Sequence, residues 1–150
     1  MFNNNSKAFR RKEKIATNIF DSSDAASLKI ANEVAELISE KQSQNRNCVL
    51  GLATGSSPIK VYQELVRKHK EEGLSFINVH TFNLDEYYPM AREEMQSYWN
   101  FMHIHLFDHV DIPKSNIHIP DGTLDKSHVT SFCEDYEQKI DDLGGLDLQI

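Results

Sequence analysis

One apolar segment with a polar turn directly behind it constrains the fold of this chain more than any other feature. Residues 48–53 are apolar nearly throughout, which is typical of a parallel strand buried on both faces. Residues 54–57 are polar and contain Gly55, so the chain can turn sharply there. Pro58 suits the first turn of a helix, because the N–H that it lacks would be unbonded at that position anyway. A buried strand, a tight turn and a helix start are therefore predicted in immediate succession.

Segments of strand and helix character alternate along the rest of the chain. Apolar residues recur at helical spacing over about 24–42, 58–72, 97–107 and 127–143, and short apolar runs at 15–20, 48–53, 76–84 and 146–150 predict strands. This alternation favours the α/β class, with a parallel sheet flanked by helices and right-handed crossovers.

We expect residues 1–13 to be a frayed basic lead-in. Residues 14–150 are expected to be part of one domain, truncated after its third or fourth strand.

Composition excludes some classes of partner. The formal net charge is −7, whereas nonspecific nucleic-acid binding needs a basic surface. No apolar stretch approaches the roughly 18 residues of a membrane span. We therefore expect no nucleic-acid partner, no membrane anchorage and a cytoplasmic location. Cys48 and Cys133 lack metal-type spacing and are expected to be reduced, packed thiols.

The turn after the apolar run is a candidate anion site, formed by Thr54, Gly55, Ser56 and Ser57. The start of the following helix leaves backbone N–H groups unbonded and carries partial positive charge, so an anion is a natural partner. The serine hydroxyls add donors. The alternative is an ordinary strand-to-helix turn in which a serine caps the helix. The pattern is neither a Walker loop nor GxGxxG, so it does not indicate a nucleotide.

A second candidate site follows the next strand-like run, where two acids and two tyrosines occur together. Asp85 stands just past the predicted carboxyl end of that strand, where open α/β sheets bind ligands. It is a candidate base, and the alternatives are a solvated loop acid or a helix cap. Glu86 is adjacent and therefore points elsewhere, which suggests a supporting role.

The histidines do not make a convincing metal site. His105 and His109 are four residues apart and His103 is near, but zinc would want a further ligand, and no HExxH or cysteine pair accompanies them. We expect no metal. Packed or surface histidines explain this pattern.

Several segments, taken in order and spacing, resemble the glucosamine-6-phosphate deaminase family. They are GLATGSSP at 51–58 followed by Tyr62, TFNLDEY at 81–87, Ser97 with Tyr98, and DHVDIP at 108–113. The resemblance implies a Rossmann-like fold about twice as long as this chain, of which this is the N-terminal half. The family's later segment of the type GxGxxGHIxFNEP, with its ring-opening histidine, is absent from this sequence.

The resemblance also implies roles for individual residues. Residues 54–57 would bind the sugar phosphate, and Asp85 would move a proton from C2 to C1 of the opened sugar. Tyr98 would lie over the sugar, although core packing with Trp99 and Phe101 is the alternative. Glu86 is included among the substrate-binding residues in its supporting role.

The implied activity is the deaminating isomerisation of glucosamine 6-phosphate to fructose 6-phosphate, a hydrolase-type step of amino sugar metabolism and N-acetylglucosamine catabolism without a cofactor. We expect this half alone to be inactive. Three alternatives stay open. They are a sugar-phosphate-binding fragment without turnover, a 6-phosphogluconolactonase-like hydrolase, and a structural fragment that forms a homo-oligomer through its open sheet edge.

Overall fold

The computed structural model describes residues 17–150 and contains one parallel sheet of four strands. The strands are β1 (Cys48–Leu52), β2 (Val79–Asn83), β3 (Ile117–His118) and β4 (Leu148–Gln149), in the spatial order β3-β2-β1-β4. All three pairings are parallel. The expected α/β class with a parallel sheet is confirmed, and the sheet reaches four strands in this chain.

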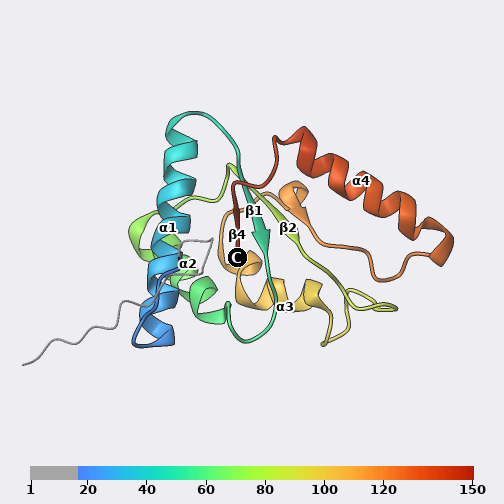
Figure 1. Cartoon of the computed structure of the whole chain (residues 1–150), viewed down its shortest axis with the longest axis horizontal. Coiled ribbons are helices and arrows are strands. Elements are labelled where there is room, and N and C mark those ends of the chain that lie inside the picture. The colour runs from blue at the N-terminus through green and yellow to red at the C-terminus, as the bar shows by residue number, and fades with distance from the viewer. Residues whose placement is uncertain (1–16) are drawn as a thin grey trace, which may run out of the picture.

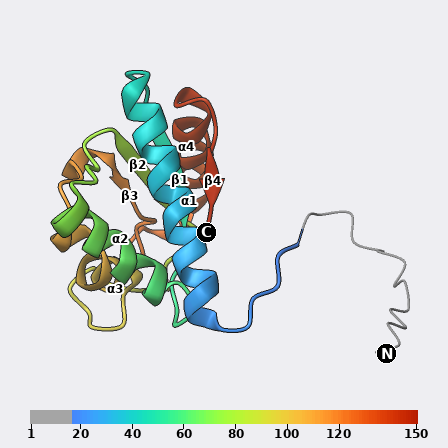
Figure 2. The same ribbon diagram turned by 90° about the vertical axis from the view of Figure 1, so that its left-hand side faces the viewer.

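Within residues 17–150, four α-helices connect and cover the strands. They are α1 (Ser23–Ser43), α2 (Ile59–Glu72), α3 (Tyr98–His105) and α4 (Val129–Asp142), with short 3-10 turns at Phe107–His109, Lys114–Asn116 and Lys126–His128. Figure 1 shows α1 and α2 on one side of the strands and α4 on the other, with α3 below the sheet. Figure 2, turned by 90°, shows α1 in front of the sheet and α4 behind it. The layers are those of helices on both faces of a sheet.

Helix ends follow local chemistry that the sequence predicts. The side chain of Ser22 accepts a hydrogen bond of 3.1 Å from the Ala25 N–H and so begins α1. Gly73 ends α2 with a left-handed φ of 77°, which a glycine adopts without strain. Ser97 begins α3 by accepting a bond of 3.0 Å from Asn100 N–H. These three boundaries lie within a residue or two of the predicted ones.

The core lies between the sheet and the helices α1 and α2. Every residue of β1 is buried, as expected for a strand covered on both faces. The buried apolar side chains that these two helices contribute are Ala31, Val34, Ile38, Val61, Tyr62 and Leu65. Each is at most 2% exposed, so this face of the sheet is sealed from water.

The edge strand β4 is tied to its neighbour by an acidic side chain. The Asp147 carboxylate accepts a hydrogen bond of 3.0 Å from Val49 N–H and forms an ion pair with Lys41. Burial raises the pKa of Asp147, but these two partners outweigh it and hold the pKa below its ordinary value. Ile150 N–H then donates to Gly51 C=O at 2.9 Å, which continues the pairing beside β1.

Several predicted strand limits are wrong. Residues 17–20 form no strand, and Ile15, Ala16 and the lead-in 1–13 lie outside the described residues. The strand predicted at 76–84 is shorter, because Phe76 N–H donates to Asp111 Oδ1 at 2.5 Å and a turn follows before β2 begins. The two-residue strand β3 was not predicted, since a run so short has no periodicity.

The helix α4 departs most from expectation. The apolar stripe Val129, Phe132, Tyr136 and Ile140 predicts a packed helix, yet no residue of α4 is fully buried. Its stripe instead lines a groove of about 780 Å3 beside β2 and β4. Cys133 is exposed in the same groove, so the prediction of two packed thiols is right only for Cys48. Among residues 17–150, no helix is both long enough and apolar enough to cross a membrane.

Candidate functional site

The register of the two central strands brings the two predicted site loops to the same edge of the sheet. Leu52, the last residue of β1, lies opposite Asn83, the last residue of β2. Thr54 and Asp85 are each two residues further on. Parallel strands are about 4.8 Å apart, so the two loops leave the sheet side by side. Leu84 N–H still donates to Leu52 C=O at 3.3 Å, which keeps the strands together up to this edge.

The turn after β1 has the properties of an anion site. Gly55 has a φ of +99°, a conformation that other residues rarely adopt. No side chain caps the N-terminus of α2, so neither serine is used as a cap. Ser56 and Ser57 are exposed. The alternative of a serine-capped turn is therefore contradicted, and the N–H groups in the first turn of α2 are open to a ligand.

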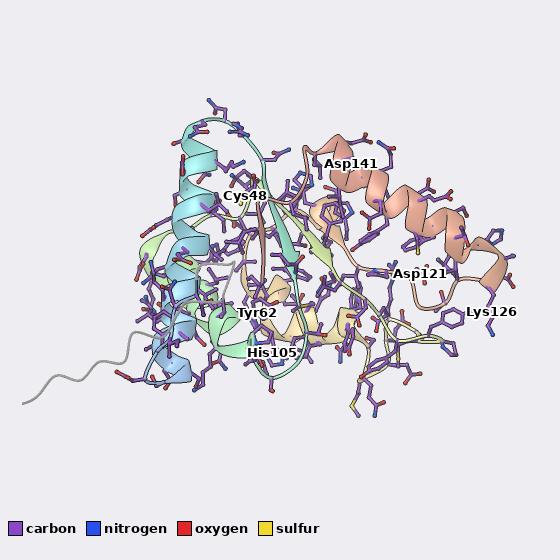
Figure 3. All side chains as sticks on the ribbon, in the orientation of Figure 1. Cys48, Tyr62, His105, Asp121, Lys126 and Asp141 are labelled. Carbon is purple, nitrogen blue, oxygen red and sulfur yellow. The ribbon has the colours of Figure 1, made fainter. Side chains whose placement is uncertain are left out.

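A tyrosine behind the turn holds it in place. The Tyr62 hydroxyl, on the second turn of α2, donates to Ala53 C=O at 2.6 Å. Burial raises the pKa of this hydroxyl, so it stays a donor. Figure 3 shows Tyr62 at the lower end of the molecule, where β1 leads into this turn, whereas Cys48 lies at the opposite end of the strand.

In the loop after β2, Glu86 acts on the protein backbone. Its carboxylate accepts hydrogen bonds from the N–H groups of Tyr98 at 2.9 Å and Trp99 at 3.0 Å, at the N-terminus of α3. It also accepts one from Tyr87 N–H at 2.9 Å. A carboxylate stabilises a helix N-terminus in this way. The structure thus gives Glu86 a positioning role, and direct contact with a substrate stays a prediction.

The two loops meet at Tyr98. Its hydroxyl lies close enough to the side chains of Tyr87, from the loop after β2, and Thr54, from the turn after β1, for both to affect its pKa. Interaction with Tyr87 and burial raise the pKa of Tyr98, interaction with Thr54 lowers it, and the negative charge of Asp85 raises it further. The rings of Tyr87 and Tyr98 are 4.7 Å apart. The core-packing alternative for Tyr98 is thus not what the contacts favour.

Asp85 is exposed at this edge, close enough for its charge to act on Tyr98. The buried residue two positions before it, Asn83, donates weakly to Leu52 C=O at 3.5 Å. Among residues 17–150, the Asn83 Oδ1 atom has no hydrogen-bond partner although it is buried. The edge therefore offers a carboxylate, a buried acceptor, phenol hydroxyls and a helix N-terminus within one short span.

Two contacts that sequence reasoning missed hold the loop after β2. The Tyr136 hydroxyl of α4 lies 2.9 Å from both Asn83 C=O and His118 C=O, so it ties the ends of β2 and β3 to the helix. Met90 N–H donates to Gly122 C=O at 2.8 Å. The helical spacing predicts Tyr136 only as a packing residue, and nothing in the sequence signals where its hydroxyl points.

The histidines are engaged in separate contacts. His103 Nδ1 lies 2.7 Å from Asp108 Oδ1, and His109 Nε2 lies 2.8 Å from Ile104 C=O. In the part of the chain that the structure describes, His, Cys, Asp and Glu side chains do not gather in groups of three that could hold a metal. That the protein binds no metal stays a prediction.

The groove of about 780 Å3 is not the predicted site. It is lined by Leu84 and Glu86, but neither Asp85 nor residues 54–57 line it. The candidate site lies instead at the ends of β1 and β2, where the two loops that carry the reactive groups lie side by side.

Known proteins share extensive sequence similarity with this chain. Residues 21–149 match the family described as glucosamine-6-phosphate isomerases/6-phosphogluconolactonase. A glucosamine-6-phosphate deaminase-like protein of Bacteroides thetaiotaomicron is 49% identical over 140 residues, which are 93% of this chain and 21% of that protein. A glucosamine-6-phosphate deaminase of Clostridium botulinum is 46% identical over 121 residues, covering 81% of this chain and 49% of the relative.

Solved structures share the fold. A monomeric glucosamine-6-phosphate deaminase superimposes with a TM-score of 0.78 at 38% identity, over 85% of this chain and 51% of that one. A 6-phosphogluconolactonase of Thermotoga maritima superimposes with a TM-score of 0.66 at 23% identity, over 82% of this chain and 53% of that one. The chain thus spans about half the length of most of these relatives. It belongs to the family of glucosamine-6-phosphate isomerases and 6-phosphogluconolactonases.

Proposed function

We propose that this chain carries the phosphate-binding and proton-transferring half of a glucosamine-6-phosphate deaminase site. The convergence at Tyr98 is the observation that supports this most directly. Its hydroxyl lies near Thr54 after β1 and Tyr87 after β2, and the charge of Asp85 acts on its pKa. A phosphate on the turn and a sugar carbon near Asp85 then fit one extended sugar phosphate.

In this proposal each group has one task. The N–H groups at the start of α2 and the hydroxyls of Ser56 and Ser57 hold the phosphate. Asp85 removes the proton from C2 of the opened sugar and returns it to C1, as a positioned general base and acid. Water then replaces the nitrogen at C2, so that ammonia leaves and fructose 6-phosphate forms. The hydrogen shift from C2 to C1 is internal and water is exchanged for ammonia, so the substrate undergoes no net oxidation or reduction and no redox cofactor is needed.

Glu86 and Tyr98 support this chemistry. Glu86 fixes the N-terminus of α3, and α3 presents Tyr98 to both loops. Loss of Glu86 would therefore move Tyr98 and Asp85 relative to the turn. Positioning of this kind accounts for a large share of enzymatic rate.

We further propose that this chain alone binds sugar phosphate without turnover. It covers about half of the deaminase relatives, and groups for ring opening are not among the residues described at the site. The hydrolase class of the reaction, the amino sugar pathway and the cytoplasmic location belong to the same proposal. The alternative is a structural fragment that self-associates through the β4 edge. Light scattering at several protein concentrations tests it, and a molecular mass that stays that of the monomer would count against it.

Ammonia release from glucosamine 6-phosphate tests the function. We would compare the chain alone, the chain fused to the second half of the Clostridium relative, and the fusion carrying Asp85→Asn. The fusion is expected to release ammonia, whereas the chain alone and the Asp85→Asn fusion release at least 100-fold less, since a lost general base costs about 10²–10⁴ in rate. Asp142→Asn, on the far end of α4, is the matched control and should leave the rate unchanged.

Two outcomes would count against the proposal. Equal turnover by the fusion with and without Asp85→Asn would remove Asp85 from its role. Hydrolysis of 6-phosphogluconolactone in place of ammonia release would assign the site to the lactonase branch of the family. Calorimetric titration of the chain alone with glucosamine 6-phosphate tests binding, and the double variant Ser56→Ala, Ser57→Ala is expected to weaken it.

A further inference from the structure

A second cavity lies on the other side of α3, at the outer edge of the sheet. Its volume is about 400 Å3, within the range of small-molecule sites. It is lined by Arg92, Trp99, His103, Asp108, Lys114, Ile117 and Ile119. The cavity is formed by the loop after β2, by α3 and by the edge strand β3. None of the candidate site residues lines it, so it is a separate feature of the fold.

Two cationic side chains line this cavity, Arg92 and Lys114. Within residues 17–150, neither Arg92 nor Lys114 forms an ion pair. The acid of the cavity, Asp108, is already engaged, because its Oδ1 lies 2.7 Å from His103 Nδ1. The charge of Arg92 also acts on Asp121, whose pKa is lowered chiefly by hydrogen bonds with Thr123. Two cations that form no ion pair therefore line one cavity of a chain whose formal charge is −7.

The other walls of the cavity combine an aromatic stack with aliphatic side chains and the His103–Asp108 pair. The rings of His103 and Trp99 are stacked with centroids 3.8 Å apart, and Phe107 packs edge-on against His103 at 5.6 Å. The bond to Asp108 fixes the orientation of the imidazole. Ile117 and Ile119 add aliphatic surface from β3. A ligand that fits must therefore combine an anionic group with a carbon skeleton.

We propose that this cavity is an accessory binding site for a phosphate monoester. A guanidinium and an ammonium together suit a phosphate, the first through paired N–H donors and the second as a point charge. The carbon skeleton of the ester lies against Ile117, Ile119 and the edge of the Trp99–His103 stack. This site is independent of the proposed function, because it shares no lining residue with the turn at 54–57 or with Asp85.

Trp99 provides a direct readout, because it is the only tryptophan in the chain. We would follow its fluorescence while adding inorganic phosphate, glucose 6-phosphate or glucose, with sodium chloride keeping the ionic strength constant. A saturable change is expected with both phosphates and not with glucose. Glucose 6-phosphate is expected to bind more tightly than inorganic phosphate, because only the ester contacts the apolar wall.

Variants separate this site from the first one. The double variant Arg92→Gln, Lys114→Gln is expected to weaken phosphate binding about tenfold or more, since each lost charged hydrogen bond costs about 1.5 kcal/mol or more. Lys70→Gln, an exposed lysine on α2, is the matched control and should bind as the unchanged chain does. The variant Ser56→Ala, Ser57→Ala should also keep the full Trp99 response. Far-UV circular dichroism checks that each variant is folded.

Three results would overturn the assignment of a phosphate site to this cavity. They are a lack of saturation with either phosphate, equal affinity in the Arg92→Gln, Lys114→Gln variant, and loss of the response in the serine variant. The last would assign the signal to the turn at 54–57. Equal affinity for inorganic phosphate and glucose 6-phosphate would contradict the assignment to an ester.

Discussion

The two faces of the sheet are covered to very different extents, although the helices on both carry an apolar stripe. On the first face, α1 and α2 bury Ile38 and Leu65 to 1% exposure or less. On the second face, Phe132 and Ile140 of α4 remain partly exposed and line the groove of about 780 Å3. Figure 1 shows the contrast, with α1 and α2 together on one side and α4 alone on the other.

The difference shows what an amphipathic pattern can and cannot predict. A stripe of apolar residues specifies which side of a helix turns toward the sheet, because that side lowers its exposure to water. It does not specify how deeply the helix is buried, which depends on whether a neighbouring element closes the layer. On the first face α1 and α2 pack against each other, whereas α4 has no neighbouring helix of this kind among the described residues.

The largest expected difference between the two faces is in the reactivity of their cysteine thiols. Burial raises the pKa of the Cys48 thiol to about 12 from an ordinary 9.0, which lowers its thiolate fraction about 1000-fold. Cys133 is exposed in the groove. With DTNB under native conditions, we expect one thiol to react within minutes and the second only on unfolding. Rapid labelling of both would show that the first face is not closed.

A matched pair of isoleucines tests the packing itself. Ile38→Ala on α1 is expected to lower the free energy of unfolding by about 2–5 kcal/mol, because the side chain is fully buried. Ile140→Ala on α4 is expected to cost less than about 1 kcal/mol, since its site is already open. Urea unfolding monitored by circular dichroism measures both. Similar losses would mean that α4 is packed in solution as tightly as α1.

Two glycines extend the comparison to the strand ends. A Cβ at Gly122 would lie 2.6 Å from both Met90 C=O and Tyr87 C=O, and these backbone atoms cannot turn aside. Gly122→Ala is expected to cost about 1–3 kcal/mol by overpacking and to displace the loop that carries Asp85.

A Cβ at Gly51 instead meets the side chain of Gln149, which can swing into the open groove. Gly51→Ala is therefore expected to cost clearly less than Gly122→Ala in the same thermal melts. The reverse order would indicate that Gln149 is held rigidly on the second face.

The smallest expected effect is a loss of folding stability at low pH, caused by two histidines on the second face. Burial lowers the pKa of both His80 and His118, whose rings are stacked beside Phe82. Their neutral forms are favoured in the folded state, so stability is complete above about pH 6.5 and falls as the pH decreases below that value. We expect His118→Gln to flatten this decline between pH 7 and pH 5, as measured by unfolding midpoints.

His128→Gln is the control for this measurement, because His128 is exposed on the 3-10 turn before α4. It should leave the pH dependence unchanged. An identical decline in all three proteins would mean that the buried histidines do not contribute to it.

Much of the fold could be predicted from local patterns, and the failures are specific. The limits of α1 and α2 were predictable, because Ser22 and Gly73 act on their own helix ends. The strand β3 and the start of β2 were not, because they depend on partners far along the chain, such as Asp111 for Phe76. The exposure of Cys133 was also not predictable, since its helix is amphipathic whether or not another element covers it.

The candidate site divides in the same way. The turn at 54–57 and Asp85 could be named from their positions after apolar runs and from the family resemblance. The role of Glu86 on the N-terminus of α3, and the proximity of Tyr98 to Thr54, could be recognised only in the tertiary structure. Side chains that bond across loops leave no periodic trace in a sequence.

The sequence by itself determined the alternation of strands and helices, the polar turn with its required glycine, and the acid that follows the second central strand. These depend on interactions between residues close in the chain, where spacing and side-chain type are sufficient. Only the tertiary structure decided that both loops meet at Tyr98, that α4 covers an open groove and that Arg92 and Lys114 face one cavity. Each of these depends on strand register and on the hand of the crossovers, which place residues far apart in the chain next to each other.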